Sequence, residues 1–470
     1  MESSTERVDL IIIGSGPAGY LAAILAARRD RSVAIIEKSE LGGTCLNRGC
    51  IPTKALLHEA FLWHHLANSG LIRTKEGMTS YFKYALGKKN AAVNQVVAGV
   101  RRLLNRDRIT LITGRASFIN PRTLSIEKDG KIIKRLESEG ILIAPGAVDA
   151  EGPPFKKDGQ RIIGTDEALN MTDLPHSMAI VGGGKRGVEF ATFFNTFEVP
   201  VTLIESENRI LPKMDREISI RYKGLLAKRG VKVLTDAKVV TVDLSEKKNS
   251  VTLHVLHKNK EEKLEFQKVL IAGDRQGNAE GLDIEKASLT LEEGFLHVDS
   301  RMRTSVPGIY AAGDIVGNGF FAHKAFLEAE IAVKNILGEE SKIDYQFIPT
   351  CLYSYPEVSS IGLTEEEARV KWGEIRIGKF PFIGCGRAIT ASEQEGMVKI
   401  ISETKYGEIL GVHIVGPSAT ELIHLGAMAM KHEIGVEGIK EMIFAHPTLS
   451  EAFFEAALDV SDEAIHIMKG

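Results

Sequence analysis

Two cysteines five positions apart, Cys45 and Cys50, are the residues of this chain whose spacing most directly suggests chemistry. Pro52 is typical of a first helical turn, so we expect Cys50 at a helix start, where unpaired N–H groups and the helix dipole favour an anion. Lys54 adds a positive charge nearby. Both effects lower the pKa of a thiol and favour the thiolate, the form that attacks disulfides. The motif therefore predicts a redox-active dithiol.

Two other interpretations of these cysteines compete with redox chemistry. A structural zinc site needs four clustered ligands, and the remaining cysteines, Cys351 and Cys385, stand far from the motif, which disfavours metal binding. A structural disulfide is the second alternative. Four cysteines in 470 residues, with no secretory signal, indicate a reducing compartment in which lasting disulfides are rare. We therefore expect a cytoplasmic protein.

A nucleotide-binding fingerprint precedes the cysteines. Residues 8–13 are almost continuously apolar and predict a buried parallel strand, and a helix is expected over residues 20–27. The glycines between them are Gly14, Gly16 and Gly19. Such glycines close a tight turn and bring a helix N-terminus against a pyrophosphate. Glu37 follows the next predicted strand, residues 33–36, and is the acidic residue expected to bind a ribose hydroxyl, which supports the motif.

The same pattern recurs in the middle of the chain. A predicted strand at residues 179–181 leads into Gly182, Gly184 and Gly187, and another at residues 201–204 ends in Glu205. A carboxylate there accepts from a ribose 2′-hydroxyl and repels a 2′-phosphate, which favours NAD over NADP. Arg209 argues instead for NADP, since an arginine near that position can bind a 2′-phosphate.

A third element is the short apolar strand at residues 309–311, which runs into Gly313 and Asp314. After two nucleotide fingerprints, we interpret Asp314 as a carboxylate placed against the sugar-alcohol part of a flavin. Strands are also expected at residues 251–255 and 268–272, and residues 337–342 read as a polar connector that precedes a final domain.

An acid–base signature lies near the end of the chain, in His446, Pro447 and Glu451. Pro447 is expected to hold the preceding residue extended, while Thr448 or Ser450 caps the following helix. A carboxylate bonded to one imidazole nitrogen fixes the tautomer and raises the basicity of the other nitrogen, as a base for a thiol requires. The alternative is an ordinary surface histidine beside a helix-capping glutamate.

Composition limits the remaining classes. A net charge of −3 and 26% charged residues give no basic face for nucleic acid, and no apolar run is long enough to span a membrane. The length of 470 residues indicates about three domains, and the 45 glycines suit the tight turns of nucleotide binding.

Together, the cysteine motif at residues 42–54, the glycine turns, residues 310–314 and residues 446–451 resemble the flavin-dependent pyridine nucleotide-disulfide oxidoreductases. The likeness covers nearly the whole chain with the motifs in the same order. It is greatest to the branch that oxidises dihydrolipoamide, at residues 42–54, Glu205 with residues 209–212, residues 322–325 and residues 464–467.

The resemblance implies an α/β fold with two Rossmann-like dinucleotide-binding domains and a C-terminal α+β dimerisation domain. It places an FAD-binding domain at residues 1–149 and 276–345, an NAD-binding domain at residues 150–275, and the interface domain at residues 346–470. It also implies an FAD-dependent enzyme that oxidises protein-bound dihydrolipoamide to lipoamide and reduces NAD⁺ to NADH.

The resemblance further assigns catalytic roles. Cys45 is the thiol that exchanges with the substrate disulfide, and Cys50 is the thiol in contact with the flavin. Lys54 and Glu189 form an ion pair beside the flavin on the nicotinamide side. The dithiol passes two electrons to FAD, which transfers a hydride to NAD⁺.

The remaining implied features concern the partner subunit and the cofactors. His446 and Glu451 are the base and its orienting carboxylate, and they reach the dithiol of the other subunit in an obligate homodimer. A lipoylated carrier of a multienzyme complex is the expected partner, with no nucleic acid and no membrane. The residues assigned to cofactor binding are Gly14, Gly16, Gly19, Glu37, Gly43, Thr44, Lys54, Gly182, Gly184, Gly187, Glu205, Asp314 and Ala322.

Three departures from the family pattern keep alternatives open. Lys185 and Arg186 replace the residues that gate the nicotinamide, Asp274 is added after Gly273, and Tyr355 replaces a histidine. The alternative function is a related NAD(P)-dependent disulfide reductase that acts on a specialised lipoyl carrier or another disulfide. A non-catalytic FAD-binding subunit is a further alternative, which needs none of the six catalytic residues.

Overall fold

The computed structural model describes residues 5–68, 74–150, 152–245 and 249–467. The chain forms two compact units. Unit 1 comprises Met1–Leu56, Tyr84–Glu151 and Asp274–Asp344, and unit 2 comprises Leu57–Lys83, Gly152–Gly273 and Tyr345–Gly470. The boundaries near residues 56 and 83 fall inside two helices, α3 (Cys50–Asn68) and α4 (Lys75–Leu104). The division into four domain segments stays a prediction.

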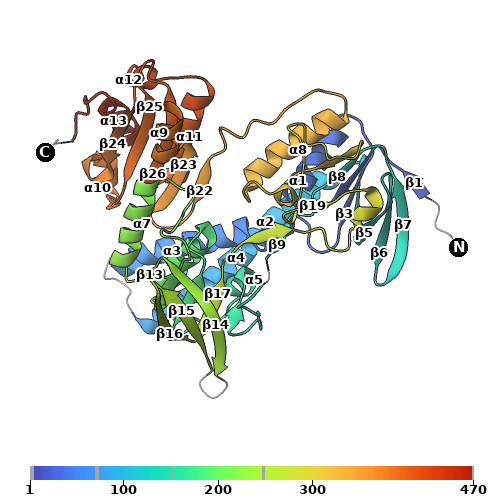
Figure 1. Ribbon diagram of the computed structural model, residues 1–470, viewed down its shortest axis with the longest axis horizontal. Coiled ribbons are helices and arrows are strands. Elements are labelled where there is room, and N and C mark those ends of the chain that lie inside the picture. Colours follow the sequence, from blue (N-terminus) through green and yellow to red (C-terminus); the bar gives the residue numbers. More distant parts are fainter. Residues whose placement is uncertain (1–4, 69–73, 151, 246–248, 468–470) are drawn as a thin grey trace. The chain divides into compact units, whose positions relative to one another are not determined.

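Unit 1 is built on a five-stranded parallel sheet in the order β21-β8-β2-β3-β4 (Figure 1). Its strands are β2 (Leu10–Ile13), β3 (Val33–Glu37), β4 (Ile109–Thr113), β8 (Ile141–Ile143) and β21 (Ile309–Ala311). β2 begins two residues later than the predicted strand at residues 8–13. The Asp9 carboxylate accepts hydrogen bonds of 2.7 Å from both the N–H and the hydroxyl of Ser32, which ends regular pairing there.

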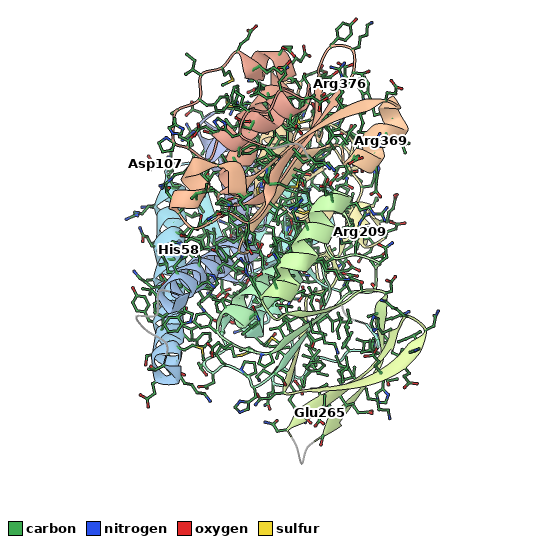
Figure 2. All side chains as sticks on the ribbon, turned by 90° about the vertical axis from the view of Figure 1, so that its left-hand side faces the viewer. His58, Asp107, Arg209, Glu265, Arg369 and Arg376 are labelled. Atoms are coloured by element: carbon green, nitrogen blue, oxygen red, sulfur yellow. The ribbon has the colours of Figure 1, made fainter. Side chains whose placement is uncertain are left out.

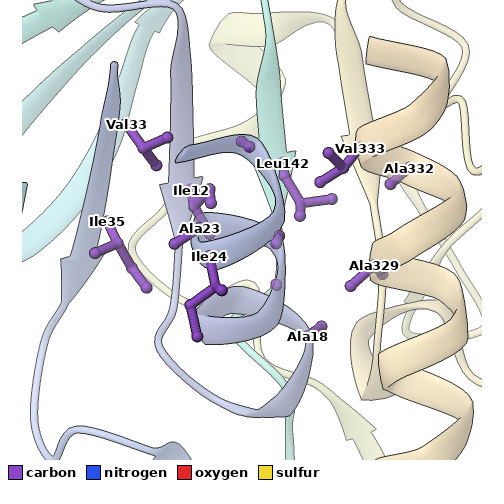
Figure 3. Packing of buried hydrophobic residues seen from close by; sticks show 14 of the residues in the cluster. Ile12, Ala18, Ala23, Ile24, Val33, Ile35, Leu142, Ala329, Ala332 and Val333 are labelled. Atoms are coloured by element: carbon purple, nitrogen blue, oxygen red, sulfur yellow. The ribbon is translucent and has the colours of Figure 1, made fainter. Parts of the chain in front are cut away.

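Helices α1 (Pro17–Ala27) and α8 (Ala322–Ile336) pack together beside this sheet (Figure 3). The contact uses small residues of both helices, among them Ala18, Ala23, Ala329 and Ala332. Alanine favours helix formation and lets the two helices approach closely, while Ile and Val of the strands fill the space beneath them. Each fully buried Ile or Val contributes roughly 1.5–3 kcal/mol. This core holds the first glycine turn in place.

Smaller elements complete unit 1. A four-stranded sheet in the order β1-β7-β6-β5 packs on the parallel sheet through Phe118, Leu124 and Leu136. Its strands are β1 (Thr5–Arg7), β5 (Arg115–Asn120), β6 (Thr123–Lys128) and β7 (Lys131–Glu137). The other elements of the unit are α2 (Gly43–Asn47), β9 (Ala147–Asp149), β18 (Arg275–Gly277), η1 (Ile284–Ala287), β19 (Leu291–Glu292), β20 (Phe295–Leu296) and η2 (Asp314–Val316).

Unit 2 contains a second five-stranded parallel sheet, in the order β10-β17-β11-β12-β13. Its strands are β10 (Ile162–Ile163), β11 (Met178–Val181), β12 (Val201–Ile204), β13 (Lys232–Leu234) and β17 (Lys268–Ile271), and its helices are α5 (Thr165–Leu169), α6 (Lys185–Thr196) and α7 (Arg216–Lys228). An antiparallel sheet follows, with Glu265 on its last strand (Figure 2). Its strands are β14 (Ala237–Ser245), β15 (Ser250–His257) and β16 (Lys260–Phe266).

The C-terminal part of unit 2 is an antiparallel sheet in the order β22-β23-β26-β25-β24, packed with helices (Figure 1). The strands are β22 (Thr350–Leu352), β23 (Glu357–Gly362), β24 (Ile375–Pro381), β25 (Met397–Glu403) and β26 (Ile409–Gly416). The helices are α9 (Glu365–Trp372), η3 (Phe382–Gly384), α10 (Gly386–Thr390), α11 (Ala419–Lys431), α12 (Val436–Lys440) and α13 (Glu451–Asp459). Every residue of β25 and β26 is buried.

Within the described ranges, none of the helices combines the length and the apolar character that crossing a membrane requires.

Candidate redox and dinucleotide sites

Cys45 lies in α2, and Cys50 is the first residue of α3, the helix start that the sequence predicted for it; both are free cysteines. A hydrogen bond with Cys50, together with burial, raises the pKa of Cys45, and Lys54 opposes this rise only in part. The lowered pKa expected for the Cys50 thiol stays a prediction, while the pKa of the Cys45 thiol is raised. Because this thiol holds its proton, its reaction calls for a base.

The cysteine motif is fixed directly to the first glycine turn. Gly42 donates its N–H to the Ser15 hydroxyl at 3.1 Å. Gly43, at the start of α2, has a left-handed φ of +59°, and a Cβ at this position would lie 3.0 Å from Cα of Gly16. Only a glycine backbone allows this approach, which places Thr44 and Cys45 next to the nucleotide fingerprint.

The first glycine turn has the shape that a pyrophosphate requires. Gly14 adopts a φ of +97°, and a Cβ on Gly19 would lie 1.9 Å from the carbonyl oxygen of Gly14, so α1 packs tightly on β2. At Gly16, by contrast, a Cβ would meet no atom of the described residues within 4 Å beyond its chain neighbours. The space in front of Gly16 and the N-terminus of α1 is therefore open to a ligand, and this part of the chain fits a dinucleotide.

The second turn, in unit 2, repeats these features. Gly182 has a φ of +108°, and a Cβ on Gly187 would lie 1.8 Å from the carbonyl oxygen of Gly182. A Cβ on Gly184, at the start of α6, would again meet nothing within 4 Å among the residues that the structure describes. Both turns thus combine two glycines required by packing with one that faces open space.

The two acidic residues of the fingerprints hold their glycine turns in the same way. Glu37 accepts from the N–H of Ser15 at 2.9 Å and from its hydroxyl at 2.6 Å. Glu205 accepts from the N–H of Gly183 at 2.6 Å. Both carboxylates are buried at the ends of their strands. Oε2 of Glu205 has a second lone pair for a ribose hydroxyl, whereas the two oxygens of Glu37 already accept from the N–H and hydroxyl groups of Ser15 and Ser39.

Arg209, the residue that argued for NADP, is engaged within unit 2 (labelled in Figure 2). Its guanidinium lies 3.1 Å from the Glu366 carboxylate and donates to the Pro212 carbonyl at 3.2 Å. A 2′-phosphate would have to compete with that carboxylate. Arg186, one of the unusual cations of the chain, donates to the carbonyl of Gly273.

Asp314 begins the η2 turn and is paired with an arginine that sequence reasoning did not assign. Arg275 lies 2.7 Å from its carboxylate, donates to the Ala147 carbonyl, and places its guanidinium 5.3 Å from the ring centre of Phe320. The Arg275 Nε is buried without a hydrogen-bond partner in the described part of the chain. An orphaned donor beside Asp314 fits a polar ligand at this turn. The available signal was the position of Arg275 directly after Gly273 and Asp274.

Ala322 begins α8, a few residues after η2. Tyr20 directly follows Gly19 on α1. Burial raises the pKa of its phenol to about 12, with Cys45 and Cys50 adding to the rise.

His446 and Glu451 are brought together as predicted. The imidazole Nδ1 lies 2.9 Å from the Glu451 carboxylate, and the imidazole is 77% exposed. Partial burial would raise the pKa of Glu451, but the Thr448 N–H and His446 outweigh it and lower that pKa. Ser450 occupies the N-cap of α13 without a side-chain capping bond, because Glu451 itself accepts from Thr448 at 2.8 Å. The expected Thr448 or Ser450 cap is therefore replaced by the glutamate.

A second histidine pairs with another carboxylate of α13. Nδ1 of His466 lies 2.6 Å from the carboxylate of Glu455, one turn after Glu451. Glu189 is buried in α6, and its carboxylate accepts from the N–H of Tyr353 at 3.0 Å. Lys54 belongs to unit 1 and Glu189 to unit 2, so their ion pair stays a prediction.

Tyr355, the third departure from the family pattern, has a physical role in unit 2. The Arg229 guanidinium lies 4.4 Å from its ring centre, and Arg229 also donates to its carbonyl. Phe61 and His64 of α3 contact the same ring edge-on or tilted, at 5.2 and 4.8 Å. An aromatic residue here stabilises a cation that would repel a protonated histidine.

Two dinucleotide-type turns and a dithiol anchored to one of them define a class, the two-cofactor disulfide oxidoreductases. The model of the pyridine nucleotide-disulphide oxidoreductases matches residues 8–329, and the model of their dimerisation domain matches residues 348–457. The chain belongs to the pyridine nucleotide-disulphide oxidoreductase family. The predictions of family, fold class, enzyme class and cofactors, FAD and NAD, are confirmed.

Individual relatives support the same conclusion. A dihydrolipoyl dehydrogenase of Bacillus subtilis is 39% identical over 98% of this chain and 100% of its own length. The mitochondrial dihydrolipoyl dehydrogenase 1 of Arabidopsis thaliana is 34% identical over 99% of this chain and 92% of its own. Among solved structures, the Cu(II) complex of the HOCl-induced flavoprotein disulfide reductase RclA from Escherichia coli is 29% identical, with a TM-score of 0.86 over 97% of this chain and 99% of its own.

Proposed function

We propose that the protein oxidises dihydrolipoamide, carried by a protein, to lipoamide and reduces NAD⁺ to NADH through a Cys45–Cys50 disulfide. The observation that carries the proposal is the dithiol at the start of α3, joined through Gly42 and Ser15 to the first nucleotide turn. Full-length identity to dihydrolipoyl dehydrogenases supports lipoamide as the substrate.

Among the sulfurs of this chain, the exchange of thiols and disulfides with the substrate needs only those of Cys45 and Cys50. A thiolate of the substrate attacks Sγ of Cys45 in the disulfide and releases Cys50 as a thiolate. The second substrate sulfur then attacks its neighbour in the mixed disulfide and releases Cys45. The substrate has lost two electrons and two protons, and Cys45 and Cys50 are reduced. The position of Cys50 at a helix N-terminus favours its release as an anion.

His446 supplies the base for these steps. Glu451 stays ionised because its pKa is lowered, so it can hold the Nδ1–H of the imidazole and leave Nε2 as the acceptor of a thiol proton. The raised pKa of Cys45 explains why such a base is needed when that thiol must react.

When bound, FAD would supply the electron acceptor for the dithiol, and NAD⁺ would supply the final hydride acceptor. This chain's residues would hold FAD through the first glycine turn, Glu37 and Asp314, and NAD through the second turn and Glu205. The pairing of Arg209 with Glu366 supports NAD, since the arginine is already neutralised by a carboxylate.

We further propose a homodimer, with His446 serving the dithiol of the partner subunit, and a lipoylated carrier protein as the partner. The dimerisation domain at residues 348–457 supports the homodimer. The cytoplasm is the proposed location, since four cysteines in 470 residues suit a reducing compartment.

The direct test is anaerobic mixing of the purified protein with dihydrolipoamide, followed by NAD⁺. We expect a long-wavelength absorption band on reduction, from a Cys50 thiolate beside the flavin, and then NADH absorbance. The Cys50→Ser variant is the control and should give neither signal. A wild-type protein that carries flavin but yields no NADH from any dithiol would reject the proposal.

A related disulfide reductase is the second candidate. Lys185 and Arg186 at the start of α6, with Arg186 bonded to the Gly273 carbonyl, set the second nucleotide turn apart from the family pattern. The structural relative from Escherichia coli is described as a flavoprotein disulfide reductase, which fits this broader class. Rapid turnover of another dithiol, with none of dihydrolipoamide, would favour this candidate.

A further inference from the structure

A buried ion pair of α8 is hydrogen-bonded to the η2 turn, which contains Asp314. The side chains of Lys324 and Glu328, one turn apart on α8, are 1% and 0% exposed, and their charged atoms lie 2.7 Å apart. Such a pair loses hydration that its mutual attraction only partly restores, so burial of two charges is weak evidence for stability. The reason for the pair must be sought in what else it contacts.

Both ends of the η2 turn are bonded to this pair. The N–H of Gly313 donates to Glu328 at 2.7 Å, and the ammonium of Lys324 donates to the carbonyl of Gly317 at 2.9 Å. Asp314 is the first residue of the turn between these glycines. Gly313 and Gly317 have left-handed φ angles of +82° and +71°, so they hold little conformational preference of their own. The ion pair therefore fixes a segment that glycine leaves free.

We infer that Lys324 and Glu328 are positioning residues that hold the Asp314 carboxylate in the geometry required for FAD binding. The inference rests on the proposed role of Asp314. Both residues act through the η2 turn rather than by contact with the flavin. The guanidinium of Arg275 also holds this carboxylate, at 2.7 Å.

The variant that tests the inference is Lys324→Met/Glu328→Leu. An apolar pair of similar volume leaves no uncompensated charge, so the protein should fold, with a melting temperature lowered only by the loss of the bonds to Gly313 and Gly317. The turn loses its two bonds, and we expect the dissociation constant for FAD to rise by about tenfold or more. Flavin loss from the holoprotein on dilution and ultrafiltration measures this change.

The chain offers a matched control on the same helix. Lys334 and Glu330 form an ion pair at 2.7 Å with the same four-residue spacing, but they are 31% and 45% exposed. Lys334→Met/Glu330→Leu should leave FAD affinity unchanged. Asp314→Asn supplies a coupling test: if the buried pair acts through Asp314, then the double substitution at Lys324 and Glu328 should weaken FAD binding little further in that background.

The outcomes separate this inference from the proposed function. A wild-type protein that binds no FAD rejects the proposed function. If the wild type binds FAD, two results overturn the positioning role alone. One is a folded double variant with the FAD affinity of the wild type. The other is a double substitution whose effect on FAD affinity is undiminished in the Asp314→Asn background. If the double variant does not fold, Glu328→Gln is judged by the same criteria. If Glu328→Gln also fails to fold, the inference is overturned, because the ion pair would then serve stability.

Discussion

The proposed base is a single exposed imidazole, and its removal gives the sharpest prediction about a side chain. His446→Gln should lower the rate of dithiol oxidation by about two to four orders of magnitude, because the glutamine amide cannot take the thiol proton. FAD content and melting temperature should not change, since the imidazole is 77% exposed. Stopped-flow reduction of the bound flavin by dihydrolipoamide measures the rate.

His466 is the matched control for that prediction. Its Nδ1 also bonds a glutamate of α13, at 2.6 Å, and its side chain is 68% exposed. His466→Gln should retain a rate within about twofold of the wild type, as expected of a surface substitution. Equal losses in both variants would show that the measured effect follows from the loss of any histidine bonded to a glutamate of α13.

At each of the two glycine turns, the glycines that packing requires differ from the glycine that faces the space for the ligand. Gly187→Ala should lower the melting temperature, because its Cβ would overlap the Gly182 carbonyl, at 1.8 Å. Gly184→Ala should keep the wild-type melting temperature, since nothing described lies within 4 Å, but should raise the KM for NAD⁺ by about tenfold or more as the methyl group occupies the ligand's space. An unchanged KM in Gly184→Ala would contradict the proposed NAD site.

A charge cluster joins α7 to β25 and α9 within unit 2. The Lys399 ammonium, 1% exposed, lies 2.9 Å from Asp215, the N-cap of α7, and 2.8 Å from Glu365. Burial alone would raise the pKa of Asp215, but His413, Lys399 and the N–H of Glu365 together outweigh it and lower that pKa. The cluster thus connects the nucleotide-binding part of unit 2 with its C-terminal sheet.

Lys399→Met should lower the stability at pH 7 by roughly 3–5 kcal/mol, because Asp215 is left buried and unpaired. A carboxyl whose pKa is lower in the folded protein contributes stability above its ordinary pKa of 3.8, and this contribution disappears as the pH falls through the lowered value. The difference between wild type and variant should therefore shrink below pH 3.8. Thermal unfolding from about pH 7 to about pH 3 measures it, and a constant difference would contradict the assignment.

The sequence predicted the local parts of these elements well and the distant contacts poorly. The glycine turns, the strands that end in Glu37 and Glu205, and the helix start at Cys50 follow from residue types a few positions apart. The Lys399–Asp215 contact joins residues 184 positions apart, and Arg275 meets Asp314 over 39 positions. No local pattern predicts such pairs, since they depend on the packing of whole elements.

The proposed dimer predicts complementation between two inactive chains. Cys50→Ser lacks the dithiol and His446→Gln lacks the base, so each homodimer should be inactive. If the base of one subunit serves the dithiol of the other, a mixed dimer contains one intact site and should show about half of the wild-type rate. Mixed dimers isolated through two different tags provide the material.

Inactive mixed dimers would mean that base and dithiol come from the same chain, or that they do not cooperate at all. Two subunits that both carry His466→Gln serve as the control for the tagging procedure, since they should retain activity. The result bears on the family assignment of a dimerisation domain at residues 348–457, which does not by itself say which subunit completes a site.

The Glu205 carboxylate accepts hydrogen bonds from two backbone N–H groups, and this limits how the protein could change its cofactor during evolution. The carboxylate that would select the cofactor also binds the N–H of Gly183 and, at 2.9 Å, the N–H of Glu207. A mutation of Glu205 toward NADP would free two backbone donors before any gain in phosphate binding. Adaptation would first have to supply a replacement acceptor and to release Arg209 from Glu366. The preference for NAD is therefore maintained, because a change to NADP requires these mutations in a particular order.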